Sequence, residues 1–139
     1  MDTKKTMEIN SKAFGNEYDW AGYSTITEFS FGESGLRLVL SGSANSESFV
    51  EVLFTGANAF QVLMECDYHA YWQKDNFRTN HMIYQIKSGG WRDRVGCNYM
   101  QVLNVDYDSQ TEWLVTANDY CVSVVSGSAP IVREFLEEE

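Results

Sequence analysis

Three cysteines and two histidines are the residues of this chain that most readily support catalysis or metal binding: Cys66, Cys97, Cys121, His69 and His81. Cys66-x-x-His69 has the spacing of a ligand pair, but zinc needs three or four converging ligands and the other cysteines are isolated. A Cys–His hydrolase would place a histidine base beside one cysteine, and no local signature surrounds any of them. An odd number of cysteines in apolar settings also argues against a disulfide framework. We therefore expect three reduced thiols, no metal and no cofactor.

Other catalytic motifs are missing from the sequence. No serine stands in a G-x-S-x-G motif, and the glycines of "SGGWRDRVG", residues 88–96, lack the pattern of a phosphate-binding loop. Acidic residues are so numerous that carboxylate pairs will occur by chance, so they do not indicate a glycosidase. The chain is therefore not expected to be an enzyme.

The charge of the chain is strongly acidic and unevenly distributed. Twenty acidic and ten basic residues give a net charge of −10. Residues 101–139 alone hold eight acidic residues and one basic residue, a net of −7. Such a charge excludes a generally basic nucleic-acid binder and attracts basic protein partners. The alternative is that the acidity only keeps a small protein soluble.

Residues 71–100 are the exception, with five basic residues, two acidic residues and six interleaved aromatic residues. Aromatic platforms beside cations are what single-stranded nucleic acids bind. The same residues are equally typical of core aromatics with a solvated basic rim, and the rest of the chain carries −13. We expect no nucleic-acid binding at physiological salt.

The elements that would position these residues are strands. Alternation of apolar and polar residues extends from residue 23 to residue 126, broken by turn sequences at 32–35 and at Asn118-Asp119. It is also broken at 67–76, which suggests a short helix or an irregular segment, and at 88–96, which suggests a loop or a single helical turn. We expect about eight strands, at 23–31, 36–42, 81–87, 98–108, 111–117 and 120–127 and in two arms joined around Gly56-Ala57-Asn58. Apolar residues on both faces of these two arms predict strands that are central in their sheet or covered on both sides. The fold class is mainly β, with α+β possible: an antiparallel β-sandwich or strongly bent sheet with one or two short helices.

Alternation also assigns side chains to faces. Val50, Val52 and Phe54 share one face, and Trp113 is expected in the core because it shares a face with Val115.

The length predicts a single domain over residues 1–139, with residues 1–20 as an irregular lead-in or short helix and 134–139 as an acidic tail. No apolar run approaches the roughly 18–20 residues that span a bilayer, and the N-terminus lacks the apolar segment of a secretory signal. We therefore expect a cytoplasmic protein that does not bind membranes.

Three stretches, in order, resemble the small bacterial immunity proteins of contact-dependent inhibition and other polymorphic toxin systems. They are "VEVLFTGANAFQVLMEC" (50–66), "SGGW" (88–91) and "EWLVTANDYCVSVVSGSAP" (112–130), and the likeness covers residues 47–130. The resemblance implies a cytosolic protein that neutralises a cognate toxin, often a basic nuclease, by direct binding and without chemistry. It implies nothing about which toxin is bound.

Two hypotheses therefore stand beside each other. In the first, an acidic face binds a basic toxin; in the second, the chain is a small non-catalytic ligand-binding or assembly module whose acidity serves solubility. For the first, the concentration of acids near the last predicted hairpin indicates the partner-binding residues Asp106, Asp108, Glu112, Asp119 and Tyr120. The oligomeric state stays open.

Overall fold

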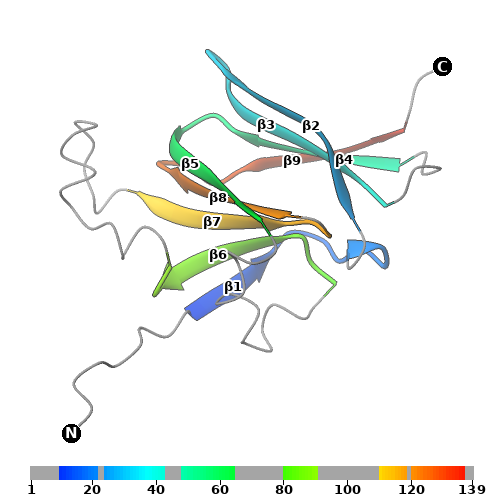
Figure 1. Cartoon of the computed structure of the whole chain (residues 1–139), viewed down its shortest axis with the longest axis horizontal. Coiled ribbons are helices and arrows are strands. Elements are labelled where there is room, and N and C mark those ends of the chain that lie inside the picture. The colour runs from blue at the N-terminus through cyan, green and yellow to red at the C-terminus, as the bar shows by residue number, and fades with distance from the viewer. Residues whose placement is uncertain are drawn as a thin grey trace, which may run out of the picture.

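Nine β-strands account for most of the chain that the computed structural model describes, which is residues 10–21, 24–42, 48–64, 80–90, 110–118 and 120–136 (Figure 1). The strands are β1 (Asn10–Phe14), β2 (Thr25–Gly32), β3 (Gly35–Ser41), β4 (Ser48–Phe54), β5 (Ala57–Met64), β6 (Ile83–Ser88), β7 (Thr111–Thr116), β8 (Tyr120–Ser126) and β9 (Ile131–Leu136). These described ranges contain no α-helix. The prediction of a mainly β protein is confirmed.

The strands form two antiparallel sheets in a sandwich-like arrangement, as Figure 1 shows. The five-stranded sheet has the order β1-β6-β7-β8-β5, and the four-stranded sheet has the order β2-β3-β4-β9. Every neighbouring pair is antiparallel. This arrangement confirms the predicted antiparallel sandwich.

The core between the sheets follows from period-two alternation, because successive side chains of a strand point to opposite faces. Val50, Val52 and Phe54 of β4 are all buried in one cluster, as their predicted common face requires. Trp113 and Val115 of β7 are buried in that same cluster, and Trp113 is 4% exposed. The assignment of Trp113 to the core is confirmed.

The predicted turn at residues 32–35 joins β2 to β3. Gly32 and Gly35 are paired across it, and Gly35 has a φ of 111°. A Cβ atom at this position would collide with the carbonyl oxygen of Phe54 on the neighbouring strand β4. Glycine is therefore required at position 35 by both its backbone conformation and its close neighbour.

The two strands predicted around Gly56-Ala57-Asn58 exist, but they do not pair with each other. β4 is an interior strand of the four-stranded sheet, whereas β5 is an edge strand of the other sheet. Val62 of β5 is accordingly 45% exposed. The prediction of a strand that is central or covered on both sides is confirmed for β4, which is central, and is wrong for β5, because apolar content does not reveal which sheet a strand joins.

Both ends of the described chain are more regular than predicted. β1 falls inside the expected irregular lead-in, where it pairs with β6. β9 extends to Leu136, inside the expected acidic tail, and it pairs with β4. Neither segment has a strong apolar pattern, since each is an edge strand with one largely solvated side. The predicted strand at 98–108 and most of the two segments that suggested short helices, 67–76 and 88–96, lie outside the described residues.

Candidate interaction surfaces

The structure describes two of the five predicted partner-binding residues, Glu112 and Tyr120; Asp106, Asp108 and Asp119 lie outside it. Tyr120 opens β8 opposite Met64 and is half-buried against the core. Glu112 is 1% exposed, and the Ser123 hydroxyl donates a hydrogen bond to its Oε2 at 2.7 Å. The expectation that Glu112 lies on an exposed acidic face is therefore corrected.

The burial of Glu112 has a local cause. It lies on the face of the five-stranded sheet opposite Trp113, and this face carries a second buried apolar cluster that includes Leu114 and Cys121. A Cβ at Gly90 would collide with the Glu112 carboxylate, so the chain passes close above it. The sequence pattern places Glu112 away from Trp113 correctly, but it does not reveal that both faces are buried.

The residues considered for metal binding or catalysis are mostly outside the described ranges: Cys66, Cys97 and His69. Cys121 is fully buried beside apolar side chains, and the His81 ring makes an edge contact with Tyr84. Within the described ranges, no three His, Cys, Asp or Glu side chains gather closely enough to hold a metal ion.

Residues 14–20 lie against β9 and form what we call the β9 seam, made of Asn16, Tyr18, Trp20, Val132, Glu134 and Leu136. The Tyr18 hydroxyl donates a hydrogen bond of 2.6 Å to Glu134 Oε1. The Asn16 amide donates a second bond, of 3.3 Å, to the same oxygen. One oxygen of an exposed carboxylate is thus held by two neutral donors.

Two hollows flank this contact. The first, of about 330 Å³, is lined by residues that include Tyr18, Trp20, Val50, Glu134 and Leu136. The second, of about 460 Å³, lies toward Gly15 and Pro130, and Glu134 also lines it. The carboxylate of Glu134 therefore separates two concave surfaces.

The position of the Trp20 ring depends on a glycine. A Cβ at Gly42 would lie 2.9 Å from Trp20 Cγ, so any larger residue there would displace the ring. The rings of Tyr18 and Trp20 are 5.2 Å apart between centroids and inclined by 44°. Both rings are half-buried, whereas their neighbours Glu17 and Asp19 are exposed. The seam therefore combines aromatic surface with acidic side chains.

The seam also shifts two pKa values away from neutral pH. Burial, reinforced by the hydrogen bond to Glu134, raises the pKa of Tyr18 from 10.0 to about 12. The hydrogen bonds from Tyr18 and then Asn16 lower the pKa of Glu134 below its ordinary value. Both shifts reinforce the states that these groups ordinarily have near neutral pH, in which the Tyr18 hydroxyl keeps its proton and Glu134 is ionised.

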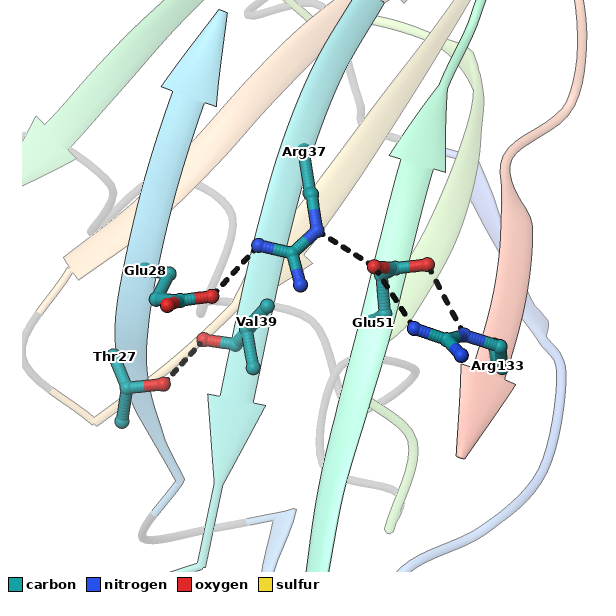
Figure 2. Close-up of polar contacts among 6 residues, drawn as sticks. All are labelled: Thr27, Glu28, Arg37, Val39, Glu51 and Arg133. Carbon is teal, nitrogen blue, oxygen red and sulfur yellow. Dashed lines mark hydrogen bonds and ion pairs between the residues drawn. The ribbon is translucent and has the colours of Figure 1, made fainter. Parts of the chain in front are cut away.

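The outer face of the four-stranded sheet carries a different arrangement, which we call the charge ladder: Glu28, Arg37, Glu51 and Arg133 (Figure 2). Arg37 contacts Glu28 and Glu51 on the two adjoining strands, each at 2.6 Å. Arg133, directly opposite Glu51 on β9, reaches Glu51 Oε1 at 3.3 Å. The ladder joins β2, β3, β4 and β9 side to side.

An exposed apolar patch lies where β2, at one edge of the four-stranded sheet, meets β5, at one edge of the five-stranded sheet. Phe29 and Phe31 of β2 contact the ring of Phe60 on β5, at 5.4 and 5.2 Å between centroids. Phe31 is 56% exposed, and Val62 adds a further exposed apolar side chain.

Neither the β9 seam nor the charge ladder was found by sequence reasoning. Their partners are far apart in the chain: Tyr18 and Glu134 are separated by 116 positions, and Glu51 and Arg133 by 82. A local signal near Glu134 is the pair of apolar dipeptides, Ile131-Val132 and Phe135-Leu136, on either side of Arg133-Glu134, and the predicted acidic tail begins within it, at residue 134.

No protein-family model, curated protein or solved structure matches this chain. No helix in the described ranges is long and apolar enough to cross a membrane.

Proposed function

We propose that this chain is a cytoplasmic immunity protein that neutralises a cognate basic toxin by direct binding, without chemistry of its own. The observation that carries the proposal is the β9 seam, where exposed Glu17, Asp19 and Glu134 adjoin the half-buried rings of Tyr18 and Trp20. Tight protein interfaces typically combine a few aromatic anchors with complementary charge. The resemblance to immunity proteins supports the same class.

The charge of the chain supports a basic partner. A net charge of −10 produces a field that accelerates association with a cationic surface and disfavours nucleic acid. A nuclease toxin presents such a surface where it binds phosphates, and an acidic inhibitor that covers this surface blocks the substrate. Asp106, Asp108, Asp119 and Tyr120 remain proposed contacts, whereas the buried Glu112 would support the fold behind them.

The second candidate is a non-catalytic ligand-binding or assembly module. The observation that favours it is the exposed apolar patch of Phe29, Phe31, Phe60 and Val62, since contiguous apolar surface often marks an interaction site. In that case the acidity of the chain would serve only its solubility.

The test of the proposed function is protection. The toxin domain encoded next to this chain would be expressed with and without it, and growth and binding of the purified pair would be measured. We expect restored growth and a complex that weakens as salt rises. A variant whose substituted residue contacts the toxin should protect less well. The variants are lysine substitutions at Asp106, Asp108, Asp119, Glu17, Asp19 and Glu134. Glu33→Lys, on the exposed β2–β3 turn, is the matched control. A chain that neither protects nor binds would contradict the proposal.

A further inference from the structure

The first hollow of the β9 seam has walls of different chemistry. The exposed Leu136 supplies apolar surface above the buried Val50, while Tyr18 and Trp20 supply aromatic surface. Phe49 and Phe135 also border it, but alternation directs their rings to the opposite face, where they stack at 5.4 Å. Its volume of about 330 Å³ lies at the lower end of ligand pockets, so it suits one side chain better than a large ligand.

Glu134 supplies the charge at this hollow. Its Oε1 accepts both the Tyr18 and the Asn16 hydrogen bonds, whereas its Oε2 accepts none from the described residues. Both donors are neutral, so they fix the carboxylate without cancelling its charge. A fixed carboxylate with one available oxygen is a preorganised acceptor for a cationic donor.

We infer that this hollow binds an arginine side chain of a basic partner protein. The planar guanidinium can lie against the rings of Tyr18 and Trp20 and donate to Glu134 Oε2. The charges support this occupant: Glu17 and Asp19 are exposed beside the two rings, and four of the last six residues of the chain are glutamates. The identity of the partner as a toxin rests on the proposed function, whereas the binding of arginine does not.

The direct test uses N-acetyl-arginine amide as the probe and N-acetyl-citrulline amide as its neutral counterpart, titrated into the full-length chain. The Trp20 indole signal, assigned with a Trp20→Phe variant, is followed by NMR. We expect a saturable shift with the arginine probe and none with citrulline. Equal shifts with both probes, or no shift with arginine, would overturn the inference.

Two variants distinguish binding of the arginine probe in the hollow from long-range attraction by the negative charge of the chain. Glu134→Gln should weaken binding of the arginine probe by about tenfold or more, the range for a hydrogen bond to a charged group. Glu33→Gln changes the net charge equally at an exposed turn and should alter binding less than about twofold. Thermal unfolding of each variant confirms that it is folded. An equal loss in both variants would mean that only long-range charge acts, which refutes the site.

The same variants distinguish this inference from the proposed function. If the chain binds the arginine probe but fails to protect against its neighbouring toxin, the proposed function is wrong and the arginine site stands. If the chain protects and Glu134→Gln protects equally well with unchanged toxin affinity, the proposed function stands and a toxin arginine does not occupy this hollow. A parallel loss of probe binding and toxin affinity supports both.

Discussion

Glu51 in the charge ladder and Glu134 in the β9 seam are carboxylates on two adjacent strands, and they are held in opposite ways. Glu51 is 15% exposed, and its two oxygens accept hydrogen bonds from Arg37 and Arg133. Glu134 is exposed, and one of its oxygens accepts bonds from the neutral groups of Tyr18 and Asn16.

The two carboxylates differ in whether a neighbouring cation neutralises their charge. Two glutamates and two arginines make the ladder neutral, so it joins four strands but offers little attraction to a charged partner. The seam orders its carboxylate, and no cation among the described residues pairs with it. A carboxylate that stabilises the sheet is thus paired with cations, whereas one suited to recognition is oriented by neutral donors.

The largest effect is expected from a third carboxylate, the buried Glu112. Glu112→Lys places a cation at a position that is 1% exposed and removes the acceptor of the Ser123 hydroxyl. We expect the free energy of unfolding to fall by about 3–5 kcal/mol, the cost of leaving an uncompensated buried charge. Urea unfolding measures it, and Glu33→Lys, on an exposed turn, should change it by less than about 0.5 kcal/mol. Equal stability of the two variants would contradict the buried position.

The next largest effect on stability is expected from a substitution at the centre of the charge ladder. Glu51→Gln removes the charge that both arginines share, and we expect a loss of about 1 kcal/mol in the free energy of unfolding, as for an exposed pair within a network. The loss should shrink in high salt because the ladder is partly exposed. A double-mutant cycle with Arg37→Gln isolates the pair, and additive losses would show that Arg37 and Glu51 are not coupled.

The contribution of Glu51 to stability should also depend on pH. The hydrogen bond from Arg37, followed by that from Arg133, holds the pKa of Glu51 below its ordinary 4.5. Because the unfolded chain then binds more protons in acid, this stabilisation is present above about pH 4.5 and is lost as pH falls through the lowered pKa. The difference in unfolding free energy between the parent and Glu51→Gln should therefore decrease in that window. A difference that does not change with pH would contradict the lowered pKa of Glu51.

The smallest effect on the free energy of unfolding is expected from Tyr18→Phe in the β9 seam, and it depends on pH in the alkaline range. The pKa of Tyr18 rises from 10.0 to about 12, so the folded chain retains the phenolic proton longer than the unfolded chain. The resulting stabilisation is present below about pH 10 and is lost as pH rises toward 12. The parent should lose more stability over this interval than Tyr18→Phe, and its difference spectrum at high pH should show a late-titrating tyrosine that is missing from the spectrum of Tyr18→Phe. Identical titrations would refute the raised pKa that burial and the hydrogen bond to Glu134 give Tyr18.

The local parts of the fold could be predicted from the sequence. The β2–β3 turn at Gly35, the common face of Val50, Val52 and Phe54, and the core position of Trp113 all follow from neighbours within a few residues. The strand β9 and the edge position of β5 could not be predicted, because edge strands carry weak patterns and sheet membership is not local.

The candidate site was predictable only as a composition: an acidic chain with aromatic residues. The prediction of Glu112 as a partner-binding residue follows from the concentration of acidic residues near the last hairpin, and neither composition nor alternation tells which faces of a sheet are covered. The seam lay outside the predicted site because Tyr18 and Glu134 come together only when β9 adds to β4 at the edge of its sheet.

The sequence by itself determined that this chain forms mainly antiparallel strands and which side chains of a predicted strand share a face, because successive side chains of a strand point to opposite sides. It also determined the excess of negative charge. Only the tertiary structure decided that Glu51 is neutralised, that Glu112 is buried and that Glu134 keeps its charge at a concave surface. Each of these depends on strand pairing and register between residues far apart in the chain, and a single sequence does not encode such pairing in any local pattern.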